Sequence, residues 1–168
     1  MIEPIRRPAA EHTLSGTALH ELMQLEGFTD HAIIPIKGDR PTIGYGSTKE
    51  VKLGDTVTEP EARARLKREV RDDFEAGIRA GAGDIPMTQG EYDSVILLAY
   101  NVGVSAVLHS TMLKLFRKGE YCDGCAQLRR WVFFQGKDCR KRENGCYGLV
   151  LRRDKEYAIC MGEHNGAL

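Results

Sequence analysis

The 168-residue sequence lacks a long apolar run, a net charge and any tryptophan beyond one. A transmembrane helix needs about 18 or more consecutive apolar residues, and no segment approaches that length, so we expect no membrane span. The N-terminal stretch MIEPIRRPAAEH has arginines but no apolar segment after them, so we expect no secretory signal. Internal repeats and low-complexity linkers are also missing. With 42% hydrophobic and 29% charged residues, the composition predicts one soluble globular domain over residues 1–168.

The zero net charge conceals an uneven distribution. Between Thr111 and Lys155, twelve lysine and arginine residues stand against five acidic residues, a net charge of +7. Such a segment would attract an anionic polymer, although a solvated helical surface has the same composition. Because the segment has neither zinc-finger spacing nor a recognisable RNA-binding signature, we expect no nucleic-acid partner.

All five cysteines lie in the C-terminal third of the chain. The Cys122-x-x-Cys125 pair could be a redox pair or half of a zinc site. No second pair with metal-ligand spacing follows, so we expect no metal. We predict structural disulfides instead, which form in oxidising compartments. One would join Cys139 to Cys146 around the polar loop CRKRENGC, and the other would join Cys125 to Cys160 across two helices.

The first half of the chain changes from helical to strand periodicity. Apolar residues at helical spacing in residues 13–25 predict a helix that ends near Glu26, where Gly27 suits a C-cap. The short runs HAIIPI and TIGYGST, separated by KGDRP, predict an antiparallel hairpin. Thr58 and Glu61 have capping-box spacing at the start of a long charged helix, which we expect to bridge two parts of the molecule.

The second half of the chain is predicted to be helical. Thr88 and Glu91 repeat the capping-box spacing before the strongly apolar run VILLAYNVG, our candidate for the central core helix. Further amphipathic segments follow, which together predict an α+β fold, mostly helical, with its small antiparallel sheet confined to an N-terminal lobe. The predicted parts are an N-terminal extension (1–17), a β-containing lobe (about 18–60), a bridging helix (58–80) and a helical lobe (85–161).

Six segments resemble, in the same order, the phage-type lysozymes of glycoside hydrolase family 24, the endolysins of many tailed phages. They are EGF at Glu26, PTIGYGST at Thr42, TQGEYDSVILLAYNVG, STMLKLFRKGEY at Ser110, QLRRW and GLVLRRDKEYAIC. The similarity covers about residues 18–161, and six degenerate segments in one order are specific. The resemblance implies a lysozyme-like fold of two lobes with a cleft between them. It also implies hydrolysis of the β-1,4 linkage between N-acetylmuramic acid and N-acetylglucosamine in peptidoglycan.

Glycoside hydrolysis uses one carboxyl group to protonate the leaving oxygen and a second group to assist on the far side of the sugar. Glu26 matches the family's general acid, and Leu25 and Phe28 beside it could desolvate the carboxyl. The family usually has its second carboxylate nine residues later, where this sequence has Pro35. The family's threonine then corresponds to Thr42, one residue further on than usual.

Asp39 is the nearest acidic residue in the hairpin turn and could take the second role. The competing interpretation is an ordinary turn aspartate that bonds local backbone. Asp30 is too close to Glu26 in the chain to face it easily across a bound sugar. We predict Glu26 as acid, Thr42 as the group that orients water, and Asp39 as base or electrostatic partner. Inverting attack would require the carboxyl groups to lie about 6.5–9.5 Å apart.

The resemblance also implies substrate-binding residues, for each of which a purely structural role remains open: Tyr45, Tyr100, Asn101 and Ser110. No cofactor is implied, since protons and water suffice for the reaction. Two alternatives to a muramidase are a catalytically degenerate peptidoglycan-binding protein and a lytic transglycosylase that uses Glu26 alone. We expect a monomer, made in the host cytoplasm, that acts in the bacterial periplasm or cell wall. A holin, a virion or a secretion apparatus could deliver it, and the sequence leaves this route open.

Overall fold

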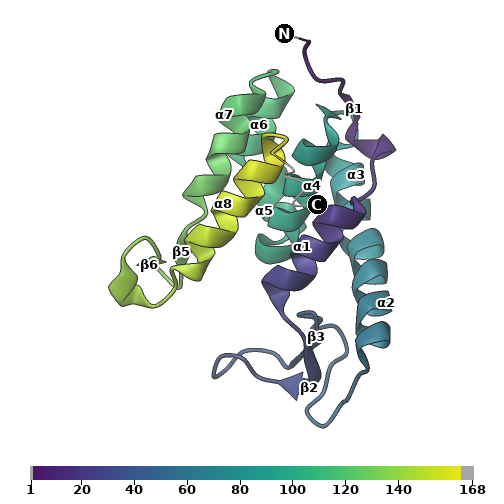
Figure 1. The fold of residues 1–168 in the computed structure, drawn as a ribbon, viewed down its shortest axis with the longest axis vertical. Coiled ribbons are helices and arrows are strands. Elements are labelled where there is room, and N and C mark those ends of the chain that lie inside the picture. The colour runs from purple at the N-terminus through teal and green to yellow at the C-terminus, as the bar shows by residue number, and fades with distance from the viewer. Residues whose placement is uncertain (1, 164–168) are drawn as a thin grey trace. The chain divides into compact units, whose positions relative to one another are not determined.

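The structure, a computed structural model, describes residues 2–163, which fall into two compact units. The smaller unit is Gly16–Asp73. The larger unit combines the N-terminal residues up to Ser15 with the chain from Phe74 onward. Figure 1 labels the elements of both units. Within the described residues, no helix is both long and apolar enough to cross a membrane.

The smaller unit begins with helix α1, Gly16–Glu26, which buries Ala18, Leu22 and Met23 along one face. Gly27 ends the helix as predicted, with φ +69° and its N–H donating to the carbonyl of Met23 at 3.1 Å. The predicted hairpin follows as strands β2 (Thr29–Ile33) and β3 (Thr42–Gly44), which pair antiparallel.

Helix α2, Glu59–Glu69, packs against this hairpin. Gly44 is required at the contact, because its φ is +63° and a Cβ there would lie 2.9 Å from the Cβ of Ala62. The predicted capping box forms, with the side chains of Thr58 and Glu61 each bonded to the other's backbone N–H. The charged helix continues as a π-helical segment (Val70–Glu75) and helix α3 (Ala76–Ala82), so a π-helical turn interrupts its α-helical pattern.

The larger unit is organised around helix α4, Gln89–Val102, which is buried from Gly90 to Ala99. This confirms the predicted core helix. It packs chiefly against α8, the last helix of the chain. The remaining helices are α5 (Val104–Leu108), α6 (Thr111–Arg117), α7 (Tyr121–Ala126) and α8 (Gly148–Cys160), with 3₁₀ turns at Ala9–Glu11, Gln127–Arg130 and Arg142–Asn144.

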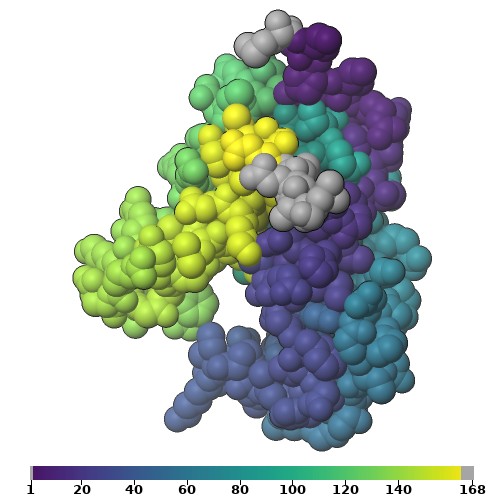
Figure 2. Space-filling view, viewed as in Figure 1, coloured from purple at the N-terminus to yellow at the C-terminus, as the bar shows by residue number. Residues whose placement is uncertain are grey.

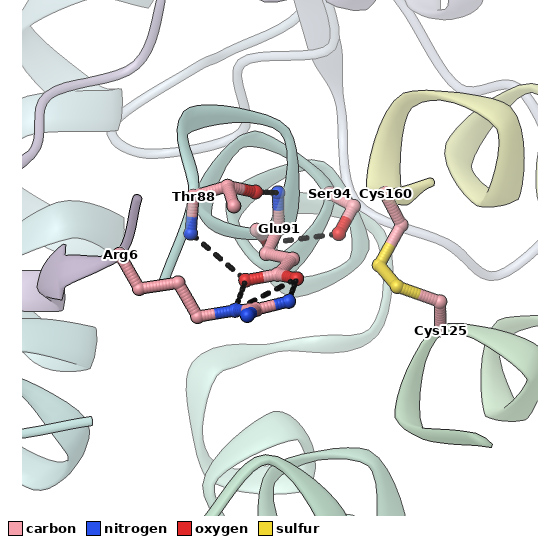
Figure 3. The surroundings of a disulfide bond; sticks show 6 residues. All are labelled: Arg6, Thr88, Glu91, Ser94, Cys125 and Cys160. Atoms are coloured by element: carbon pink, nitrogen blue, oxygen red, sulfur yellow. Dashed lines mark hydrogen bonds and ion pairs between the residues drawn. A yellow bond between two sulfur atoms is a disulfide. The ribbon is translucent and has the colours of Figure 1, made fainter. Parts of the chain in front are cut away.

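The N-terminus of α4 is fixed by several interactions at Glu91 (Figure 3). Its carboxylate completes the predicted capping box by accepting from the N–H of Thr88 at 2.8 Å. The same carboxylate pairs with the guanidinium of Arg6 at 2.7 Å. Arg6 in turn lies 3.6 Å from the ring centroid of Tyr121, so the N-terminal residues are attached to the helical core.

Both predicted disulfides are confirmed. Cys125–Cys160 joins α7 to α8, and Cys139–Cys146 closes the loop between residues seven apart. Cys122 is a free, exposed thiol.

The prediction that β structure is confined to the N-terminal lobe is wrong. Strand β1 (Arg7–Pro8) pairs with β4 (Pro86–Met87), and β5 (Phe133–Phe134) pairs with β6 (Lys137–Asp138). Each of these strands has only two residues, which is too short to show the alternation of a strand in the sequence.

Candidate active site

Glu26 is the last residue of α1, and its side chain is half-buried. The left-handed Gly27 turns the chain directly from the helix into β2. Leu25 is half-buried, but Phe28 is 40% exposed, with its ring 5.5 Å from that of Tyr45. The apolar environment predicted around Glu26 is therefore only partly formed by these two neighbours.

Thr42 is the first residue of β3, half-buried and paired with Ile33. At the other end of the ladder, Thr29 pairs with Gly44. Thr29 lies three residues after Glu26, and Gly44 lies two residues after Thr42. Their pairing in the two-stranded sheet places the residues that follow Glu26 beside the residues that follow Thr42. The β2–β3 pairing thus places Thr42 on the strand beside the one that begins three residues after Glu26.

Asp39 occupies the exposed turn between the two strands. Its N–H donates to the carbonyl of Ile36 at 2.9 Å, and its carboxylate accepts from the N–H of Arg40 at 2.8 Å. These are the local bonds of a turn aspartate. Pro35, at the family's usual position for the second carboxylate, is exposed in the same loop.

Tyr45 is buried just after β3, and its hydroxyl donates to the carboxylate of Glu59 at 2.9 Å. Burial raises the pKa of Tyr45, and the hydrogen bond to the Glu59 carboxylate adds to this effect. The pKa of Glu59 is lowered, first by its bond to Arg63 and then by Tyr45. The Tyr45 hydroxyl therefore connects the end of β3 to the start of α2.

The other three predicted substrate-binding residues belong to the larger unit, and each makes contacts within it. The ring of Tyr100 lies 4.9 Å from that of Phe74. Asn101 is exposed near the end of α4, and its side-chain oxygen accepts from Arg153. Ser110 caps α6, accepting from the N–H of Leu113 at 3.3 Å and donating to the carbonyl of Val107 at 2.6 Å.

Arg153 holds Asn101 as part of a buried ionic cluster on α8. Arg152 and Arg153 both pair with Glu156, at 3.0 and 2.8 Å. Arg153 also donates to the carbonyl of Trp131 at 2.8 Å. Since the guanidinium is bonded on several sides, it fixes the position of the Asn101 amide.

A pocket of about 370 Å³ lies beside the start of α6. Ser110 lines it together with His109 and with Gln127, Arg130 and Trp131 of the QLRRW segment, none of which was predicted to bind substrate. These residues come from two separate helical segments, so only the tertiary structure brings them together. Among the residues described, no group of three or more His, Cys, Asp or Glu side chains is arranged to hold a metal ion.

The family assignment follows from comparison with known proteins. The sequence profile of the family "Phage lysozyme" matches residues 23–156. The chain belongs to the phage lysozyme family. It is accordingly a lysozyme-type glycoside hydrolase with cell-wall lytic function, and the resemblance seen in its six segments is confirmed.

Two relatives and one solved structure illustrate the similarity. The endolysin of Acyrthosiphon pisum secondary endosymbiont phage 1 is 31% identical over 123 residues, which cover 73% of this chain and 81% of that protein. The probable prophage lysozyme of Escherichia coli strain K12 is 36% identical over 80 residues, 46% of this chain and 45% of that protein. The structure of the endolysin from Escherichia coli O157:H7 phage FAHEc1 superimposes with a TM-score of 0.74 at 27% identity, covering 91% of this chain and 96% of that one. The α+β lysozyme-like fold is therefore confirmed.

Proposed function

We propose that this lysozyme hydrolyses the β-1,4 linkage between N-acetylmuramic acid and N-acetylglucosamine in peptidoglycan by direct, inverting attack of water. The observation that carries the proposal is the placement of Glu26 at the end of α1, directly before the hairpin that holds Thr42 and Asp39. A carboxyl group at a helix end and a hydroxyl on an adjacent strand supply the acid and the water-binding group that the reaction needs.

In the proposed mechanism, Glu26 donates a proton to the glycosidic oxygen as the bond to the leaving sugar breaks. The Thr42 hydroxyl holds the attacking water on the opposite side of the ring. Asp39 supplies negative charge that stabilises the oxocarbenium-like transition state and accepts the proton of the water. We propose no cofactor, because these groups and water complete the reaction.

We propose that two of the four predicted substrate-binding residues contact the substrate and that the other two support the site. Tyr100 and Asn101 would contact the substrate directly. The exposed Asn101 amide is held by Arg153 through its oxygen, and its NH₂ group still has hydrogen-bonding capacity. The Tyr100 ring, which lies against Phe74, would contribute an apolar contact. Tyr45 and Ser110 would act indirectly, because their hydroxyls already bind Glu59 and the α6 backbone.

We further propose that the protein acts as a monomer in the bacterial periplasm or cell wall. Its two disulfides support an oxidising site of action. A holin, a virion or a secretion apparatus would bring it there from the host cytoplasm.

Clearing of outer-membrane-stripped Gram-negative cells tests the catalytic part of the proposal. We expect Glu26→Gln to lower the clearing rate by at least about 100-fold, the usual contribution of a general acid. The matched control is Glu11→Gln, which removes an exposed carboxylate from the 3₁₀ turn of the larger unit and should clear at the wild-type rate. Failure of the wild-type protein to clear cells, with binding to isolated walls retained, would indicate the degenerate binding protein instead.

A lytic transglycosylase is the second candidate, because Pro35 replaces the usual carboxylate and Asp39 is bonded to its own turn. Mass spectrometry of the released fragments separates the two reactions. Hydrolysis leaves reducing N-acetylmuramic acid ends, whereas a transglycosylase leaves 1,6-anhydro ends. Proton NMR of the first product to form reports the anomer, and retention of the β configuration would contradict inversion.

A further inference from the structure

The β5–β6 hairpin presents two consecutive phenylalanines at its tip. The strands are joined by Gln135 and Gly136, which both have positive φ, +48° and +75°. This is the backbone of a tight two-residue hairpin turn. Phe134 pairs with Lys137 immediately before the turn, and Phe133 pairs with Asp138 one position back. We call residues 133–138 the aromatic hairpin; Figure 1 shows it extending beyond the first turn of α8.

Both phenylalanines remain in contact with water. Phe133 is 58% exposed and Phe134 42% exposed. In Figure 2, the yellow-green atoms of this region form a projection at the left of the view. A phenylalanine side chain has a large apolar surface, so two neighbouring exposed rings indicate a surface that binds a partner.

The base of the hairpin is held by burial, a hydrogen bond and a disulfide. Val132 and Cys139 flank the strands and are almost completely buried, and the N–H of Cys139 donates to the carbonyl of Val132 at 2.8 Å. The disulfide between Cys139 and Cys146 ties the following loop to this base. The rings are therefore held outward before any partner binds, which lowers the entropy cost of association.

The chain on either side of the apolar tip has an excess of positive charge. Residues 129–146 contain six lysine or arginine residues and two acidic residues, a net charge of +4, of which Arg129 pairs with Asp154 outside this range at 3.2 Å. Asp138 is paired with Arg140 at 2.9 Å, and Arg140 lies 5.7 Å from the ring centroid of Phe133. Lys137, at the turn, and Lys141 form no ion pair with the residues that the structure describes.

We propose that the aromatic hairpin binds the surface of an anionic lipid bilayer, with its two phenylalanines in the headgroup–acyl boundary and its cations against the lipid phosphates. Apolar residues projecting from a cationic surface bind anionic membranes in this way. Successive strand residues point to opposite faces, so the two rings do not make one flat platform for a sugar, whereas a tip inserted end-on buries both. The proposal is independent of the catalytic mechanism and adds a membrane contact to a wall-degrading enzyme.

Co-sedimentation of the whole protein with vesicles tests the proposal. We expect binding to phosphatidylglycerol/phosphatidylcholine vesicles that weakens with salt, and much weaker binding to pure phosphatidylcholine. The double variant Phe133→Ser/Phe134→Ser should bind the anionic vesicles at least about tenfold more weakly. The matched control is Leu53→Ser, which removes a 62% exposed apolar side chain from the smaller unit and should bind like wild type.

Two further measurements identify the surface. Trp131 is the only tryptophan and lies two residues before Phe133, so its fluorescence should change on addition of anionic vesicles. Lys137→Gln/Lys141→Gln should lower anionic-vesicle affinity roughly tenfold and reduce its salt dependence. Lysis of isolated walls by all these variants should equal that of wild type, which shows that the fold is intact.

Three results would overturn the proposal. The first is equal vesicle binding by wild type and by the double phenylalanine variant. The second is equal affinity for neutral and anionic vesicles. The third is binding by this hairpin to isolated peptidoglycan or nucleic acid, with no binding to vesicles.

Discussion

The carboxylate of Asp39 accepts a hydrogen bond from the backbone N–H of its neighbour Arg40 at 2.8 Å. The side chain is thus bonded within its own turn and also exposed to solvent. The bond itself requires only an acceptor oxygen, whereas the proposed catalytic role requires a negative charge. Asparagine keeps the acceptor oxygen and removes the negative charge. The substitution Asp39→Asn therefore separates the turn role from the catalytic role.

We predict that Asp39→Asn lowers the rate of wall lysis by about 100-fold and leaves the thermal midpoint unchanged, because the charge is lost and the turn bond is kept. Turbidity clearing and thermal unfolding measure the two effects. Asp55→Asn is the matched control, since Asp55 is an exposed turn residue of the same unit that accepts from the N–H of Lys52 at 2.8 Å. Wild-type lysis by Asp39→Asn, with lower stability in Asp39→Ala, would make Asp39 a turn residue only.

The second prediction concerns the hydroxyl of Thr42, which we propose to orient the attacking water. Thr42→Ala should lower the lysis rate by about 10- to 100-fold, whereas Thr42→Ser keeps the hydroxyl and should stay within a few-fold of wild type. Thr29→Ala controls for the loss of a half-buried threonine from the same two-stranded ladder. Steady-state rates on isolated walls measure all three variants. Equal losses in Thr42→Ala and Thr42→Ser would show that the side chain acts through its packing.

Signals between residues close in the sequence correctly predicted several helix ends. The capping boxes at Thr58 and Thr88 both formed, because each depends on residues only three apart. The end of α1 at Glu26 followed from the glycine after it for the same reason.

Contacts between distant residues could not be predicted in this way. The sequence predicts Glu91 as a capping-box residue of a helix. Only the folded chain shows that Arg6, 85 residues away, donates to the same carboxylate. Nothing in the sequence indicated the hydrogen bond from the Tyr45 hydroxyl to Glu59, which depends on the packing of β3 on α2. For Asp39, the sequence left a turn role and a catalytic role open, and the structure shows the turn bond directly.

The disulfides give a prediction for stability. Cys125–Cys160 spans 35 residues and Cys139–Cys146 spans seven, so the first removes more entropy from the unfolded chain. Cys160→Ser should lower the free energy of unfolding by about 4 kcal/mol and Cys146→Ser by about 2 kcal/mol. Urea unfolding at pH 7 under non-reducing conditions measures both. Cys122→Ser, which removes only the free thiol, should match wild type; a large loss in this variant would mean that Cys122 takes part in a bridge.

Tyr92 gives a prediction for pH dependence. The side chain is 1% exposed and donates to the carboxylate of Glu75 at 2.9 Å, and Glu75 also accepts from the N–H of Leu14. Burial, reinforced by the negative charge of Glu75, raises the pKa of Tyr92 well above its ordinary value near 10. The fold therefore favours the neutral phenol. Its contribution to stability is fully present below about pH 10 and is lost at higher pH, because the unfolded chain then ionises first.

Tyr92→Phe should accordingly change both the free energy of unfolding at pH 7 and the way in which this free energy varies with pH. At pH 7 the variant should be less stable by about 1.5 kcal/mol, since the hydrogen bond to the Glu75 carboxylate is lost. Above about pH 10 the wild type loses stability through this phenol and the variant cannot, so the difference between them should shrink. Urea titrations at pH 7, 9 and 10.5 measure the difference directly. A gap that stays constant over this range would mean that the folded protein does not hold Tyr92 in its neutral form.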